Sequence, residues 1–250
     1  MTEKETLMYQ IMSEISKTDA PIVFKGAMIA KLILAESGFT LLERQTRDID
    51  ANWVGTPPSM DDLVNTINKS LGSLKSSVLA VAFREYGDKM SAGISIREKQ
   101  TNEELISMDI DMRPVYGSKV YQYGEVLVKG VLVNEILTDK ISVLSDKMIF
   151  RRAKDMLDVY ALTHCITVNT VDVYDVLMKK PDRVIGAFNE FINRRQDIEH
   201  AYNKLRGVEN KPPFDHIYLY LEEFLQPFIA KDMAPQIWEN GKTWTLCNAM

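Results

Sequence analysis

The chain has 250 residues, of which 46% are hydrophobic and 26% charged, and its formal net charge is −5. This length can bury one large core or two small ones, and the composition is that of an ordinary globular protein. The negative charge argues against a general nucleic-acid coat but leaves room for a local basic patch. The polar N-terminus lacks a signal-peptide pattern and no segment approaches membrane-spanning length, so we expect a cytoplasmic protein with no membrane partner.

The first half of the chain is predicted to combine helices with strands. Apolar residues at helical spacing predict helices over residues 2–16, 26–36 and 60–71. Alternating segments rich in Val, Ile, Tyr and Ser predict strands over residues 41–49, 77–83, 92–98, 104–112 and 119–128. Gly38 is placed to end the second helix, and Ser59 with Asp62 forms a capping pattern for the third. We therefore expect a mostly β core with helices packed against it.

From about residue 134 the hydrophobic period becomes helical. This pattern predicts helices over residues 134–145, 146–164, 170–180, 184–205 and 214–229. No Gly-, Ser- or Pro-rich linker separates the two halves, so we place a domain boundary near residue 145 without a flexible connection. The expected fold is α+β, with a sheet domain over residues 1–145 and a helical C-terminal domain over residues 146–250.

Two aspartates spaced i, i+2 are the strongest chemical signal in the chain. On an extended strand Asp48 and Asp50 point to the same face, and two adjacent carboxylates repel each other unless a cation lies between them. Mg²⁺ prefers such oxygen ligands and takes water and phosphate oxygens for its other positions. The helix that begins at Gly26 supplies N–H groups and a dipole that favour phosphate. Together these features indicate a site for a nucleoside triphosphate and a metal.

A second Asp-Ile-Asp occurs at residues 109–111, within the predicted strand 104–112. One interpretation makes Asp109 or Asp111 the third carboxylate of a metal cluster with the first pair. The other makes both of them outward-facing strand residues beside Arg113. The pattern alone leaves both interpretations open.

Lys140 falls inside the apolar stripe of the predicted helix 134–145. A buried lysine needs an anionic partner, and a triphosphate in an adjoining cleft would be one. Alternatively, its methylene chain covers apolar surface while the ammonium reaches water. The spacing alone does not favour either interpretation. In the next predicted helix, Asp155 is four residues from Arg151, which is most simply a surface ion pair.

Four ordered motifs resemble those of the AbiEii/AbiGii nucleotidyltransferase toxins, members of the DNA polymerase beta-like nucleotidyltransferase superfamily. The motifs lie between residues 24 and 160, and the ordered set is far more specific than any one motif. They are Phe24-Lys25-Gly26-Ala27, Arg44-x-Thr46-x-Asp48-Ile49-Asp50, Glu135-Ile136-Leu137-x-x-Lys140 and Arg152-x-Lys154-Asp155-x-x-Asp158-x-Tyr160.

The resemblance implies a nucleotidyltransferase-type mixed sheet and a toxin of a bacterial toxin–antitoxin or abortive-infection pair, with a cognate antitoxin. Such an enzyme uses a nucleoside triphosphate with Mg²⁺, and relatives modify the 3′ end of tRNA. By motif, Asp48 and Asp50 would hold the metal. The motifs do not fix a third carboxylate, for which we prefer Asp109 to Asp111. The nucleotide would be bound by Gly26, Ala27, Arg44, Thr46 and Lys140, and the catalytic set would be Asp48, Asp50, Lys140 and Asp155.

One residue departs from the motif, because the family usually has a second glycine or a serine where this chain has Ala27. Alanine keeps the backbone N–H but adds a methyl group and offers no hydroxyl to a phosphate. This leaves open a non-catalytic module that binds a triphosphate or a partner. A second alternative, which shares the same site, is a nucleotidyltransferase that modifies protein hydroxyls. Basic residues that could attract an RNA backbone are Lys147, Arg151, Arg152 and Lys154.

Overall fold

The computed structural model describes residues 2–39, 43–86, 90–180, 183–239 and 241–247. Contacts divide the chain into two compact units. Unit 1 comprises Met1–Leu32 and Gln45–Leu132, and unit 2 comprises Ile33–Arg44 and Val133–Met250. The boundary predicted near residue 145 would follow helix α4 (Val133–Leu144), whereas the contacts place α4 in unit 2.

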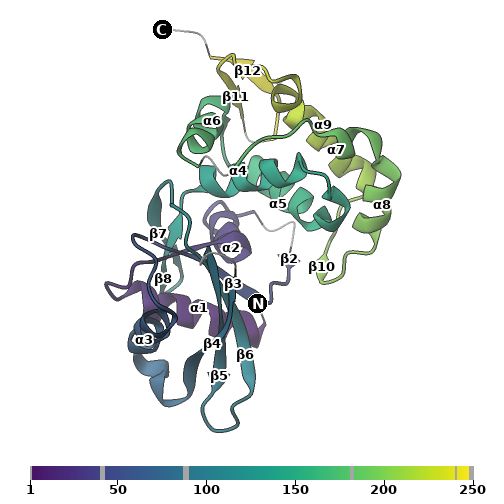
Figure 1. Cartoon of the computed structure of the whole chain (residues 1–250). Helices are drawn as coiled ribbons and strands as arrows, with labels where there is room; N and C mark the ends of the chain where they lie inside the picture. Colours follow the sequence, from purple (N-terminus) through teal and green to yellow (C-terminus); the bar gives the residue numbers. More distant parts are fainter. Residues whose placement is uncertain (1, 40–42, 87–89, 181–182, 240, 248–250) are drawn as a thin grey trace. The chain divides into compact units, whose positions relative to one another are not determined.

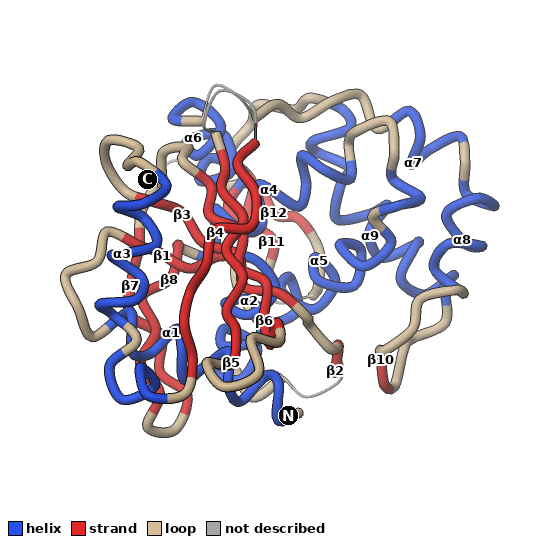
Figure 2. Tube along the Cα trace, turned by 60° about the horizontal axis from the view of Figure 1, so that its bottom comes forward, coloured by secondary structure: helices blue, strands red, loops and turns tan. Residues whose placement is uncertain are grey.

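Unit 1 is built on a seven-stranded sheet in the order β4-β5-β6-β3-β1-β8-β7 (Figures 1 and 2). The β3/β6 and β1/β8 pairs are parallel and the other pairs are antiparallel, so the sheet is mixed as predicted. Its strands in chain order are β1 (Ile22–Lys25), β3 (Asp48–Trp53), β4 (Val78–Tyr86), β5 (Ser91–Glu98), β6 (Glu104–Asp111), β7 (Ser118–Tyr123) and β8 (Val126–Val131).

Three helices accompany this sheet, close to their predicted ranges. They are α1 (Glu3–Ser16), α2 (Gly26–Glu36) and α3 (Met60–Ser70), followed by a short 3-10 turn over Gly72–Ser76. The hydroxyl of Ser59 accepts a hydrogen bond from the Asp62 amide at 3.1 Å, which caps α3 as the sequence predicts. Tyr9 of α1 stacks on Tyr123 of β7, so α1 covers one face of the sheet.

Two predicted strands have different bounds. Residues 41 and 42 of the predicted strand 41–49 lie outside the described part. The described remainder is not one strand, because residues 45–47 are in no strand and β2 (Glu43–Arg44) pairs with β10 (Val208–Glu209). The strand that carries the aspartates begins at Asp48 and continues to Trp53, since its later residues are buried in the sheet. The predicted strand 119–128 is a hairpin that turns at Gly124, where φ is +57°.

Unit 2 is mainly helical, which confirms the predicted α+β class with a helical C-terminal region. Its helices are α4, α5 (Ala153–Cys165), α6 (Thr170–Lys179), α7 (Asn189–Asn193), α8 (Arg195–Asn203) and α9 (Phe214–Ala230). A small three-stranded sheet, not predicted, contains β9 (Val168–Asn169), β11 (Gln236–Trp238) and β12 (Trp244–Leu246). Within the described residues, no helix is long and apolar enough to cross a membrane.

Two predicted helices of unit 2 are interrupted. The prediction over 146–164 becomes a 3-10 turn at Ile149–Arg151 followed by α5, with Arg152 outside helical geometry. The prediction over 184–205 becomes α7 and α8, because the segment before them bonds to the end of α4 instead of to itself. The Gly186 amide donates to Ser145 Oγ at 2.7 Å, and a Cβ on this glycine would lie 2.6 Å from the Ser145 carbonyl oxygen.

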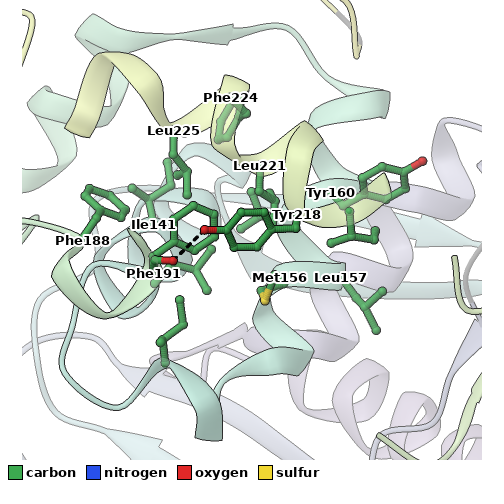
Figure 3. Close-up of a cluster of buried hydrophobic side chains, with 14 of the residues drawn as sticks. Ile141, Met156, Leu157, Tyr160, Phe188, Phe191, Tyr218, Leu221, Phe224 and Leu225 are labelled. Carbon is green, nitrogen blue, oxygen red and sulfur yellow. Dashed lines mark hydrogen bonds between the residues drawn. The ribbon is translucent and has the colours of Figure 1, made fainter. Parts of the chain in front are cut away.

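Aromatic and aliphatic side chains from α4, α5, α7 and α9 form the core of unit 2 (Figure 3). Within it the Tyr218 hydroxyl donates to the Phe191 carbonyl at 2.9 Å, so this buried polar group is satisfied. Trp238 is fully buried, and the Trp244 indole donates to the Phe224 carbonyl at 2.9 Å. Both tryptophans are packing residues of this core.

Candidate active site

The positions of Asp48 and Asp50 on β3 follow from the alternation of side chains along a strand. Ile49, Ala51 and Trp53 are buried on one side of the strand, so Asp48 and Asp50 point to the other, as their spacing predicts. Asp48 is exposed and Asp50 half-buried. Two carboxylates on one face, accessible in this way, can share a cation.

Asp109 extends this acidic face onto the neighbouring strand. The parallel register pairs Asp50 directly with Asp109, and side chains of directly paired residues lie on the same face. The Asp109 side chain is 44% exposed, and its Oδ1 atom is 3.9 Å from Arg84 Nη2. Asp48, Asp50 and Asp109 therefore form a group of accessible carboxylates, which we call the acidic face.

Asp111, the other candidate for a third carboxylate, is engaged elsewhere. It is buried and forms ion pairs with Lys25 at 2.9 Å and Arg113 at 2.6 Å. Burial by itself raises the pKa of Asp111, but the Arg113 hydrogen bonds and the nearby Lys25 charge outweigh it and bring the pKa well below its usual value. The carboxylate that is open to a ligand is thus Asp109.

The first residue of α2 touches the acidic face. Gly26 has a φ of +70°, and a Cβ added to it would lie 2.2 Å from Asp50 Oδ2. Glycine is therefore required here both by backbone conformation and by the close approach of the carboxylate. Ala27 follows on the same turn and is half-buried. The first N–H groups of a helix, which favour anions, lie beside the metal-binding candidates.

Replacing Gly26 with alanine tests this close approach. We expect Gly26→Ala to lower the free energy of unfolding by about 1–2 kcal/mol from the left-handed backbone alone, and to displace the Asp50 carboxylate. Gly124→Ala is the matched control, because φ is +57° there and nothing lies within 4 Å of the added methyl group. Urea unfolding should show a cost for both variants, whereas only Gly26→Ala should weaken Mg²⁺ binding in calorimetry, because only this methyl group displaces Asp50. Equal Mg²⁺ affinity of the two variants would contradict a role of Asp50 in binding the cation.

The second motif offers two further nucleotide-binding candidates, Thr46 and Arg44. Thr46 is buried, and its amide donates to Glu5 Oε1 of α1 at 3.3 Å. The same carboxylate forms an ion pair with Lys31 of α2, so α1 ties α2 to the residues that precede Asp48. Arg44 lies in β2, and its side chain is outside the described part of the structure.

Lys140 of unit 2 has carboxylate partners, which neither sequence interpretation foresaw. Its ammonium lies 3.0 Å from Asp155 and 2.5 Å from Asp158, both on α5, and the Lys140 side chain is 10% exposed. Burial lowers the pKa of Lys140, but the two aspartate charges outweigh this effect and raise it. Asp155 also lies 3.0 Å from Nε of Arg152, the residue directly before α5, where the sequence suggested Arg151.

Glu135, the first residue of the same motif, has a structural contact of its own. It is 1% exposed and its Oε1 atom is 2.5 Å from Lys180 Nζ. Sequence reasoning missed this pair and the pair between Lys25 and Asp111, because their members are far apart in the chain. For the Lys25–Asp111 pair, the sequence offered one signal, which is that a basic residue, Lys25, directly precedes the glycine that opens α2.

The donor chemistry of the acidic face fits a hard cation. Within the described ranges, no three His, Cys, Asp or Glu side chains already converge on a metal-sized position. Mg²⁺ does not require such a cage, since it commonly binds one or two carboxylates together with water and substrate phosphates. Asp48 and Asp50 could supply those two carboxylates and Asp109 a third after a side-chain rotation.

Comparisons with known proteins come from solved structures. MenT4, a nucleotidyltransferase toxin from Mycobacterium tuberculosis, is similar with a TM-score of 0.47 and 18% identity, over 69% of this chain and 61% of MenT4. An antigenic nucleotidyltransferase-like protein from Paracoccidioides brasiliensis is similar with a TM-score of 0.47 and 14% identity, over 72% of this chain and 89% of that protein. No protein-family model and no curated protein sequence matches the chain.

The chain thus spans less than two thirds of the MenT4 length.

Proposed function

We propose that this chain is a Mg²⁺-dependent nucleotidyltransferase, which moves a nucleotide from a nucleoside triphosphate to an acceptor hydroxyl. The observation that supports the proposal is the contact between the first residue of α2 and Asp50, within a group of three accessible carboxylates. A cation held by the carboxylates and a phosphate held by the helix N–H groups would then be neighbours. Carboxylates alone would repel the polyanionic substrate.

The three aspartates of the acidic face and the first two residues of α2 have proposed roles. Asp48 and Asp50 bind the metal, Asp109 is the third ligand, and the amides of Gly26 and Ala27 bind phosphate oxygens. Bound Mg²⁺ would neutralise the charge that builds up on the phosphate oxygens and lower the pKa of the attacking hydroxyl. The hydroxyl oxygen forms a bond to the α-phosphorus, the bond to the bridging oxygen breaks, and pyrophosphate leaves while the hydroxyl proton passes to solvent. Catalysis by the protein is then mainly positioning.

The other residues carried over from the motifs keep roles in this proposal. Thr46 and Arg44 are proposed to contact the nucleotide. Lys140 is proposed to steady the triphosphate and the departing pyrophosphate. Asp155, 3.0 Å from Lys140 Nζ, would then set the direction of that ammonium as a positioning residue.

The proposed acceptor is the 3′ end of tRNA, in the setting of a toxin with a cognate antitoxin. Support comes from Lys147, Arg151 and Lys154, which are exposed close together in the sequence of unit 2. The Arg151 and Arg194 guanidinium groups lie 5.9 and 5.1 Å from the ring centre of Phe150, so cations and an aromatic ring are combined here. Cations of this kind attract phosphate backbones, and binding should weaken as salt rises.

The test is a labelling reaction. The whole chain is incubated with Mg²⁺, total tRNA and each of the four labelled triphosphates in turn, beside an Asp48→Ala control. The proposal predicts labelled tRNA from at least one triphosphate with the wild-type chain, and none with the control. Absence of label with every triphosphate, or label that survives Asp48→Ala, would contradict it.

Two other outcomes identify the alternative functions. Triphosphate binding measured by calorimetry, without turnover on any RNA or protein, would indicate a binding module. Nucleotide adducts found by mass spectrometry on this chain or on its antitoxin would indicate that the acceptor is a protein hydroxyl.

A further inference from the structure

Asp111 has the wrong surroundings for a metal ligand. Its Oδ1 atom accepts from Arg113 Nε at 2.8 Å and from the Arg113 amide at 3.0 Å. Its Oδ2 atom accepts from Arg113 Nη2 at 2.6 Å and from Lys25 Nζ at 2.9 Å. A carboxylate has about four lone-pair positions, and these four contacts use them. A cation could bind only by displacing a basic side chain.

The Lys25–Asp111 pair crosses the strand that carries the acidic face. In the sheet, β3 lies between β1 and β6. Lys25 of β1 is paired with Asp50, and Asp111 of β6 is paired with Asn52, so the lysine must pass over β3 beside Asp50 to reach its partner. Asn52, which is 1% exposed, donates to the Arg113 carbonyl at 3.0 Å and so links Arg113 to β3.

Lys25 is also the residue directly before Gly26. A tether on its side chain therefore holds the turn from β1 into α2 against β3 and β6. This is the turn at which Gly26 approaches Asp50 so closely that a Cβ would lie 2.2 Å from the carboxylate oxygen. The Lys25–Asp111 ion pair and the close approach of Gly26 to Asp50 therefore constrain the same turn.

We propose that Asp111 is a positioning residue: with Arg113 it holds Lys25 across β3, and so fixes the start of α2 against the Asp50 carboxylate. The inference rests on the proposed function, for which it names two further residues. The inference gives the two aspartates of β6 different roles, because Asp109 would bind the metal and Asp111 would position the residues around it. Lys25 and Asp111 should accordingly act as one unit.

The test compares Asp111→Asn, Lys25→Met and the double variant, with Lys17→Met as the matched control. Lys17, the exposed residue directly after α1, forms an ion pair with Glu14 at 2.6 Å, so its substitution removes a lysine without affecting the Lys25–Asp111 contact. Mg²⁺ binding to each whole chain is measured by calorimetry, and kcat and KM for the triphosphate are measured separately. Lys25→Arg serves as the conservative variant that keeps the charge.

We expect Asp111→Asn and Lys25→Met each to lower kcat/KM by about 10- to 100-fold, the loss that a small misplacement of reacting groups produces. The double variant should be no worse than either single variant, because both remove the same contact. Mg²⁺ affinity should stay within about threefold of wild type, since no ligand is lost, and Lys25→Arg should recover most of the activity.

A tenfold or greater loss of Mg²⁺ affinity in Asp111→Asn would overturn the inference, because it would make this residue a ligand. Additive effects of the two single variants would also overturn it. If Asp111→Asn does not fold, Lys25→Met and Lys25→Arg carry the comparison, since Lys25 is 18% exposed and can be replaced with less disturbance. A wild-type chain that binds Mg²⁺ and triphosphate without transfer would refute the proposed function. The positioning role of Asp111 would then be tested by triphosphate affinity, which should fall in Asp111→Asn and Lys25→Met, and unchanged affinity would overturn it.

Discussion

Asp50→Asn is expected to reduce nucleotide transfer by about 100- to 1000-fold, the loss found when one group that stabilises transition-state charge is removed. Asp50 is the carboxylate that meets the start of α2 and pairs in register with Asp109, so its charge is central to the acidic face. The asparagine side chain keeps the shape and removes the charge. The measurement is the initial rate of label incorporation at saturating Mg²⁺ and triphosphate.

Asp19→Asn provides the control for this variant. Asp19 is exposed and lies between α1 and β1, away from the acidic strands in sequence. Its substitution changes the net charge by the same amount, so it reports any general effect of charge on substrate attraction. A rate for Asp50→Asn within a few-fold of the Asp19→Asn rate would contradict the role assigned to Asp50.

Lys140→Met is expected to lower the free energy of unfolding by about 3–5 kcal/mol, the usual cost of removing one partner from a buried ion pair. The substitution leaves Asp155 and Asp158 facing each other with side-chain exposures of 6% and 11%. Arg152 still contacts Asp155, whereas both contacts of the Lys140 ammonium, with Asp155 and with Asp158, are lost. Urea unfolding at pH 7 measures the loss.

The sign of the pH dependence gives an independent check on this variant. In the wild-type chain burial lowers the pKa of Lys140, but the charges of Asp158 and Asp155 outweigh it and raise that pKa above its value in the unfolded chain. A group with a raised folded-state pKa adds stability below its unfolded pKa and loses it as pH rises through the folded value. The deficit of Lys140→Met should therefore be fully present at pH 7 and shrink only as the pH rises beyond 10.5, the ordinary lysine pKa. A deficit under about 1 kcal/mol at pH 7 would instead fit a solvent-exposed pair.

The features that sequence predicted well are those set by local periodicity. The shared face of Asp48 and Asp50 follows from the two-residue period of a strand, and the α2 start follows from a single glycine. Most helices of unit 2 were also placed within a few residues. Their breaks were missed where a segment bonds to a distant element, as Gly186 bonds to Ser145.

The choice between Asp109 and Asp111 could not be made from the sequence. It depends on the register between β3 and β6 and on Lys25 of a third strand, and these contacts join residues 59 to 86 positions apart. The partners of Lys140 were hidden for the same reason, because packing of α4 on α5 brings Asp155 and Asp158 to it. Alternation shows which residues share a face, whereas tertiary packing decides which of them meet.

The central claim is that the acidic face binds a divalent cation beside the start of α2. Diffraction from crystals of the whole chain grown with Mn²⁺ and a non-hydrolysable triphosphate tests it most directly, because Mn²⁺ gives an anomalous signal and replaces Mg²⁺ at oxygen ligands. The account predicts an anomalous peak about 2–2.3 Å from carboxylate oxygens of Asp48 and Asp50, with phosphate oxygens completing the shell. A peak bound to other residues, or a triphosphate bound away from Gly26, would contradict it.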